Sequence, residues 1–140
     1  MGRVGGGEIG SGGTRERVWE GLIKGMEAWW RGGEGEGMSM VLEPRPGGRL
    51  YRDLGDEAGH FWGHVQVIKP PSLLEICGPL FFSSPVLSHL SFRPREAGGK
   101  TVLALAHSVN GEVAPECTKH AARAWPQALG NGPQRYARPH

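Results

Sequence analysis

The sequence is poor in the features that direct a chain to a membrane, a nucleic acid or a disulfide framework. No apolar run approaches the roughly 20 residues that cross a bilayer. The net charge is only +2, from 16 basic and 14 acidic residues, which excludes a strong attraction to nucleic acid or anionic lipid. The two cysteines, Cys77 and Cys117, have no CxxC spacing, so we expect buried, reduced thiols rather than a zinc knuckle or a disulfide framework.

Targeting signals are also missing from the start of the chain. The first residues lack the apolar core of a signal peptide, and Gly6 stands where a myristoylation signal needs Ser or Thr. We therefore expect a cytoplasmic protein with no nucleic-acid and no membrane partner. Its 140 residues, of which 38% are hydrophobic, indicate one domain with one core.

Glycine dominates the first thirteen residues, and residues 5–10 formally match the GxGxxG dinucleotide fingerprint. That fingerprint needs a preceding buried strand and a helix that begins at its last glycine. Neither pattern is present, so nucleotide binding is not predicted. We expect residues 1–13 to form a weak first strand or a tail, and residues 14–140 to form the domain.

A helical pattern follows this segment. Thr14 is placed to cap a helix that begins at Arg15, and Val18 and Leu22 share one face of it. A second short helix is expected to include Trp30, and the glycines of residues 32–37 predict a loop.

From Met38 the hydrophobic period changes to two, which indicates half-buried strands. The expected strands are Met38–Leu42, Leu50–Leu54, His60–Ile68, one around Leu74 and Ile76, Val86–Phe92, and Leu103–His107. Turns are expected at residues 55–59 and 96–99. A helical period returns over residues 114–128, and Pro133 should bend or end that helix. The order predicts an α+β chain with an antiparallel sheet and its helices on one face.

In this order the chain resembles the START-like (SRPBCC) superfamily, and within it the branch of activators of the heat-shock-protein-90 ATPase (Aha type). The resemblance rests on the segments Arg17–Glu20, Ala28–Trp30, Pro46–Leu50, Trp62–Val65 and Leu105–Ser108, with Trp125 after them. It implies a helix-grip fold, in which a curved sheet of six or seven antiparallel strands wraps a long C-terminal helix. Two short helices follow the first strand, and an apolar cavity lies inside.

The resemblance and the strand parity together predict which residues line this cavity. They are Trp30, Met40, Leu42, Leu50, Val65, Val67, Leu74, Ile76, Phe81, Phe82, Leu90, Leu105, His107 and Trp125. His107 shares the inward parity of Leu103 and Leu105, so it is either a core histidine or a polar anchor for a ligand. Phe81 and Phe82 form either a lid or a contact patch.

Other candidate chemistry finds no support in the spacing. His60 and His64 are four apart in a strand, too far apart to share one zinc ion. Neither Asp53 nor Glu75 has a second carboxylate beside it in the pattern, and Ser108 faces away from His107. We therefore expect no metal, no cofactor and no catalytic residue.

The leading hypothesis is a binding module that holds an unidentified small apolar or amphipathic ligand in its cavity. An alternative, implied by the resemblance, is a protein-interaction module that contacts a chaperone. A second alternative is an enzyme of the polyketide-cyclase kind with His107 as acid or base. The residues supply no second catalytic group, which favours binding over catalysis.

Overall fold

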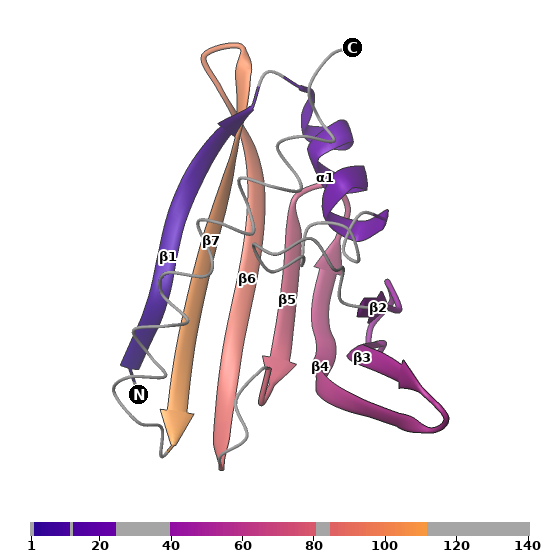
Figure 1. Ribbon diagram of the computed structural model, residues 1–140. Helices are drawn as coiled ribbons and strands as arrows, with labels where there is room; N and C mark the ends of the chain where they lie inside the picture. Colours follow the sequence, from indigo (N-terminus) through magenta and orange to yellow (C-terminus); the bar gives the residue numbers. More distant parts are fainter. Residues whose placement is uncertain (1, 12, 25–39, 81–84, 112–140) are drawn as a thin grey trace, which may run out of the picture.

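The computed structural model describes residues 2–11, 13–24, 40–80 and 85–111. These residues form one helix and seven strands (Figure 1). The elements are β1 (Gly2–Ser11), α1 (Arg15–Lys24), β2 (Met40–Leu42), β3 (Arg49–Gly55), β4 (Ala58–Lys69), β5 (Leu73–Gly78), β6 (Val86–Ala97) and β7 (Lys100–Gly111).

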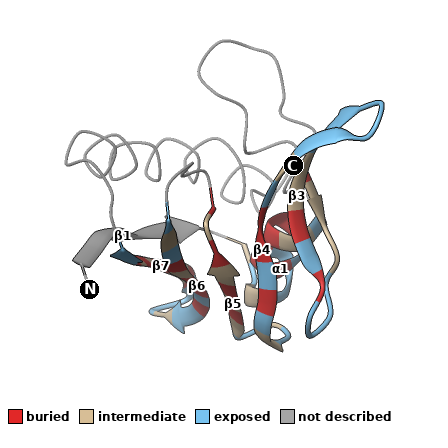
Figure 2. Ribbon diagram, turned by 90° about the horizontal axis from the view of Figure 1, so that it is seen from below, coloured by how far each residue is buried: buried red, intermediate tan, exposed pale blue. Residues whose placement is uncertain are grey.

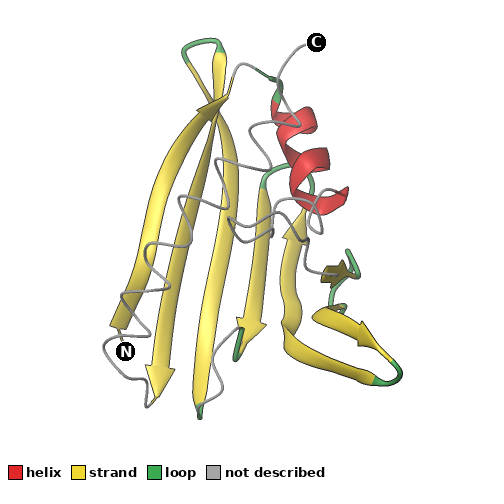
Figure 3. Ribbon diagram, in the orientation of Figure 1, coloured by secondary structure: helices red, strands yellow, loops and turns green. Residues whose placement is uncertain are grey.

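All seven strands belong to one antiparallel sheet in the order β1-β7-β6-β5-β4-β3-β2 (Figure 3). The predicted antiparallel sheet and the helix near the N-terminus are therefore confirmed. The predicted second short helix, the long C-terminal helix and the bend at Pro133 lie outside the described residues. No helix among the described residues is long and apolar enough to cross a membrane.

The first helix begins where the sequence predicts. The Arg17 backbone amide donates a hydrogen bond of 3.2 Å to the Thr14 hydroxyl, which caps the first turn. Val18 and Leu22 are 1% and 0% exposed, and α1 contacts β6 and β7. We call the face of the sheet that α1 covers the inner face and the opposite face the outer face.

The glycine-rich start of the chain forms a strand rather than a tail. Strand β1 extends over ten residues and pairs with β7 from Gly2 opposite Val109 to Ser11 opposite Thr101. One irregularity interrupts this register between Arg3 and Gly5. The strand is longer than the weak one we expected, because ladder hydrogen bonds to β7 support a backbone of low strand propensity.

Both long hairpins turn more tightly than predicted. The β3–β4 loop has φ of 53° at Asp56 and 63° at Glu57, and the β6–β7 loop has φ of 58° at Gly98 and 80° at Gly99. Two consecutive residues of positive φ are the signature of the type I′ turn, whose twist matches that of paired strands. The loops are therefore only residues 56–57 and 98–99, which lie within the turns predicted at residues 55–59 and 96–99.

Two bulges in β4 change which side chains face inward. The register skips Trp62 between β3 and β4, and it skips Gln66 between β4 and β5. After the second bulge, Val67 stands opposite Glu75, while Ile68 stands opposite the fully buried Leu74. The prediction that Val65 and Val67 share a face is therefore wrong, because one extra residue reverses the alternation.

The core lies between α1 and the inner face, where the buried residues form bands along the strands (Figure 2). Pairing across β4, β5, β6 and β7 arranges the inner face in rows. The row of His107 contains Val65, Ile76, Leu90 and His107, and the next row toward α1 contains Ile68, Leu74, Phe92 and Leu105. On the other side of the His107 row lies a row of Gly78, Ser88 and Val109, which we call the Ser88 row.

Candidate functional site

His107 is a titratable side chain within the apolar inner face. It stands on β7 between Leu90 of β6 and Gly5 of β1, and its exposure is 0%. Burial lowers the pKa of its imidazole from 6.5 to about 4, because the charged form loses its hydration. At neutral pH the inner face therefore holds a neutral imidazole.

Ser88 is a second polar side chain on the same face. It is 0% exposed, and among the described residues its Oγ has no hydrogen-bond partner. Because Ser88 is opposite Val109 and His107 is opposite Leu90, the two polar residues are diagonal neighbours on adjacent strands. Diagonal neighbours in an antiparallel pair lie about 7–8 Å apart. The hydroxyl and the imidazole therefore share one small region of the inner face.

The strand beside Ser88 cannot supply a side chain to this region. Gly78 stands opposite Ser88, and a Cβ on Gly78 would come within 2.4 Å of the Gly63 Cα and of the Trp62 carbonyl oxygen. A glycine is required there because the β4 backbone approaches too closely for any other residue. The residue opposite Ser88 on β5 therefore places no side chain beside the Ser88 hydroxyl.

Most of the described residues predicted to line a cavity do lie in the core. Fully or nearly buried are Met40, Leu50, Val65, Leu74, Ile76, Leu90, Leu105 and His107, while Leu42 is partly buried against the same cluster. Val67 is on the other face. Trp30, Phe81, Phe82 and Trp125 lie outside the described residues. The cavity itself stays a prediction.

Sequence reasoning missed Ser88, although a signal for it was present. It has the same parity as Leu90 and Phe92, which were placed inward. A hydrophobic alternation marks inward positions by their apolar residues, so it does not mark a serine at such a position. Trp62 was also missed as an inner residue of this region; it is 2% exposed because of the bulge in β4.

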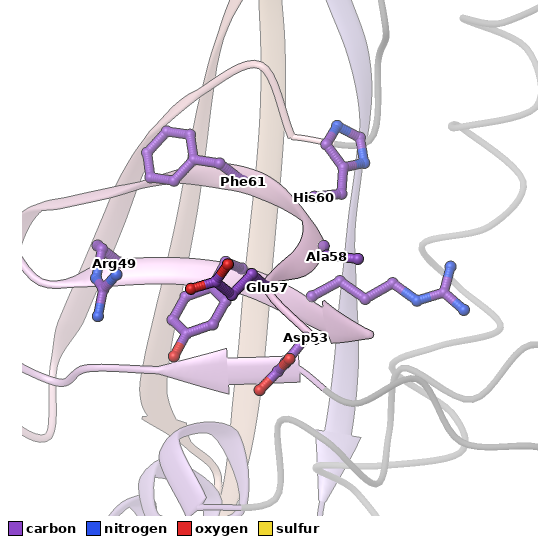
Figure 4. A pocket seen from close by; sticks show the side chains of 9 residues that line it. Arg49, Asp53, Glu57, Ala58, His60 and Phe61 are labelled. Carbon is purple, nitrogen blue, oxygen red and sulfur yellow. The ribbon is translucent and has the colours of Figure 1, made fainter. Parts of the chain in front are cut away.

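A hollow lies at the β3–β4 hairpin, and its lining differs from the residues predicted to line a cavity (Figure 4). It is an open groove of about 400 Å³. Its lining consists of Arg49, Tyr51, Arg52, Asp53, Glu57, Ala58, Gly59, His60 and Phe61. The labelled side chains spread around the hairpin and do not converge on one point. None of the residues predicted to line a cavity is among them.

Arg49, at one end of this groove, already has a hydrogen-bond partner in Glu43. Glu43 accepts hydrogen bonds from the Arg49 backbone amide at 2.8 Å and from its Nε at 2.9 Å. These bonds lower the pKa of Glu43 to about 2. Arg49 also lies 4.8 Å from the centre of the Tyr51 ring. The hydrogen bonds to Glu43 join the two ends of the β2–β3 connection and leave Arg49 poorly placed to bind an anion.

The outer face holds a row of His64, Cys77 and His89 on three neighbouring strands. Cys77 is a free thiol that is partly exposed, which corrects the expectation that it is buried. Its pKa is raised, first by burial and then by the charge of Glu75. No three His, Cys, Asp or Glu side chains in the described part of the chain are grouped closely enough to hold a metal ion.

Sequence comparison assigns the chain to no family: no family model and no curated protein matches it. Solved structures do match. CV1439 from Chromobacterium violaceum aligns with a TM-score of 0.71 at 14% identity, over 96% of this chain and 98% of that one. MLL2253 from Mesorhizobium loti gives 0.70 at 16% identity, over 94% and 95%. The Aha1 dimer from Colwellia psychrerythraea gives 0.65 at 16% identity, over 92% and 91%. The chain has the START-like (SRPBCC) fold.

This result confirms the superfamily resemblance at the level of fold, including a likeness to an Aha1 protein. Identities of 14–16% carry no information about activity. The chaperone contact and the polyketide-cyclase activity therefore stay predictions. The site has to be interpreted from the residues of the START-like inner face themselves.

Proposed function

We propose that this START-like domain binds a small apolar or amphipathic molecule against the inner face of its sheet. The observation that carries the proposal is the diagonal pair of Ser88 and His107, two buried polar groups whose rows on β4–β7 contain otherwise only glycine and apolar residues. Ligand sites are mostly apolar with a few polar groups that fix orientation. The START-like fold, which is typical of ligand-binding proteins, supports the same proposal.

The energetics favour binding by burial. Each Å² of apolar ligand surface removed from water stabilises the complex by about 25 cal/mol. The rows of Leu90 and Phe92 supply apolar contacts, and the two polar groups supply hydrogen bonds. A hydrogen bond adds about 1 kcal/mol when it forms and costs more when a buried group is left without one. Burial therefore supplies the affinity, and the polar groups select the orientation.

The same geometry argues against catalysis. A serine nucleophile needs a base within hydrogen-bond distance and a third group that orients the base. Among the described residues the Ser88 hydroxyl donates no hydrogen bond to a base, and the rows of Ser88 and His107 contain no carboxylate. The neutral imidazole of His107 is thus placed to contact a ligand rather than to activate Ser88.

Titration with Nile red, a neutral dye that fluoresces in apolar surroundings, tests the proposal. We expect saturable binding of one dye per chain. The variant Ser88→Phe fills the inner region and should weaken binding at least about tenfold, because a ring displaces the dye from its contacts. The matched control Ser108→Phe adds the same ring on the outer face of β7 and should bind normally. Circular dichroism checks that both variants are folded.

Two results would contradict the proposal. The first is the absence of saturable binding to the wild-type chain. The second is equal loss of binding in folded Ser88→Phe and Ser108→Phe, which would place the dye elsewhere. Loss of dye binding in a variant of the β3–β4 groove, such as Phe61→Ala, would identify that groove as the binding surface instead.

A further inference from the structure

The Ser88 hydroxyl is a buried hydrogen-bonding group that the described protein leaves unused. Its Oγ is inaccessible to solvent and has no hydrogen-bond partner among the described residues. A buried hydroxyl without a partner costs about 1–3 kcal/mol, so such groups are rare in folded proteins. Ser88 lies on the inner face between Gly78 and Val109, near the start of β6, and water still does not reach its Oγ. These observations point to a partner that is not part of the described chain.

The nearby surface offers this partner no charge. The rows of Ser88, Leu90 and Phe92 contain no Asp, Glu, Lys or Arg among the described residues. Arg52 is on the inner face of β3, three strands from β6. At about 4.8 Å per strand its backbone is about 14 Å from that of Ser88. Among the described residues, an ionised group at Ser88 would therefore have no adjacent counter-ion.

His107 does not change this conclusion at neutral pH. Its low pKa keeps the imidazole uncharged, so it can take part in hydrogen bonds but cannot balance a carboxylate. Among the described residues, a carboxylate beside Ser88 would lose its hydration and gain only neutral neighbours. A hydroxyl or carbonyl group, in contrast, loses little hydration and gains the serine as a partner.

From this geometry we infer that Ser88 determines specificity by hydrogen-bonding a neutral hydroxyl or carbonyl group at the buried end of an amphipathic ligand. Because serine both donates and accepts, it fits either group. The corresponding carboxylate is excluded. This inference rests on the proposed ligand-binding function and specifies the chemical class of that ligand.

Three compounds with one ring system test the inference: naphthalene, 2-naphthol and 2-naphthoate. At pH 7.5 the first two are neutral and the third is an anion. We would measure their affinities for the wild-type chain and two variants by calorimetry. Wild type should bind 2-naphthol about tenfold more tightly than naphthalene, the effect of one hydrogen bond. It should bind 2-naphthoate at least about tenfold more weakly than 2-naphthol.

The variants separate the hydroxyl of Ser88 from other effects. In Ser88→Ala the preference for 2-naphthol over naphthalene should fall to about one, while naphthalene affinity is unchanged. The control Ser108→Ala removes a hydroxyl from the outer face of the neighbouring strand and should keep the wild-type preference.

The outcomes distinguish this inference from the proposed function. If none of the three compounds binds the wild-type chain, the proposed function fails and the inference fails with it. If naphthalene and 2-naphthol bind but Ser88→Ala keeps the preference, only the role of Ser88 is overturned. If 2-naphthoate binds most tightly, the site has a cation within reach and the neutral ligand class is wrong.

Discussion

Lowering the pH should decrease the free energy of unfolding of this protein through His107. Replacing His107 should remove this part of the pH dependence. The pKa of the imidazole is about 4 in the folded chain, and we take the unperturbed value of 6.5 for the unfolded chain. Between these values the unfolded chain binds a proton that the folded chain does not. The contribution of His107 to the free energy of unfolding is therefore fully present above about pH 6.5, is lost as the pH falls toward 4, and changes no further below that.

The magnitude follows from the two pKa values. Between about pH 7.5 and pH 5 the linkage predicts a loss of about 2 kcal/mol in the free energy of unfolding, out of a limit of about 3 kcal/mol at lower pH. Urea unfolding of the wild-type chain and of His107→Gln at both pH values measures it. The two proteins differ only at position 107, so the difference between their stability changes isolates His107.

Parallel stability changes in the two proteins would refute the reasoning. If His107→Gln does not fold, NMR titration of the wild-type imidazole gives the same test. We expect the His107 Cε1 proton to titrate near pH 4, and a midpoint near 6.5 would show that the side chain is hydrated.

Three further predictions concern stability measured by urea unfolding. Leu90→Ala should lower the free energy of unfolding by about 3 kcal/mol because Leu90 is 0% exposed. Leu87→Ala, on the same strand at 59% exposure, should change it by less than about 0.5 kcal/mol. Equal effects would contradict the placement of Leu90 on the inner face and Leu87 on the outer face. Gly78→Ala should cost about 2 kcal/mol because its Cβ meets the β4 backbone, and a neutral result would show that β4 and β5 separate easily. Ser88→Ala should raise stability by about 1 kcal/mol in the absence of ligand, and a loss would indicate that the hydroxyl is already bonded.

The sequence predicted the parts of the fold that depend on local patterns. Thr14 caps α1 because its hydroxyl reaches an amide three residues on, and this interaction is encoded within one turn. The alternation along β6 predicted the inward positions of Leu90 and Phe92, and β6 pairs with β5 and β7 without interruption. Regular strands can be predicted because their side chains alternate with a fixed period.

The remaining features depend on pairing between strands. The bulge at Gln66 leaves no mark in the hydrophobic pattern of β4, so Val67 was assigned to the wrong face. The length of β1 depends on its partner β7, because its glycines have low strand propensity. The unsatisfied state of Ser88 is a property of its neighbours, and no single sequence position encodes it.

The most direct test of the central claim is an NMR titration of the wild-type chain with 2-naphthol. If the inner face binds a small neutral amphiphile, the signals of Ser88, Leu90 and the His107 ring should shift together and saturate at one ligand per chain. The signals of His89 and Ser108, on the outer face, should stay unchanged. Shifts confined to the β3–β4 groove around Phe61, or no saturable shift at all, would contradict the account.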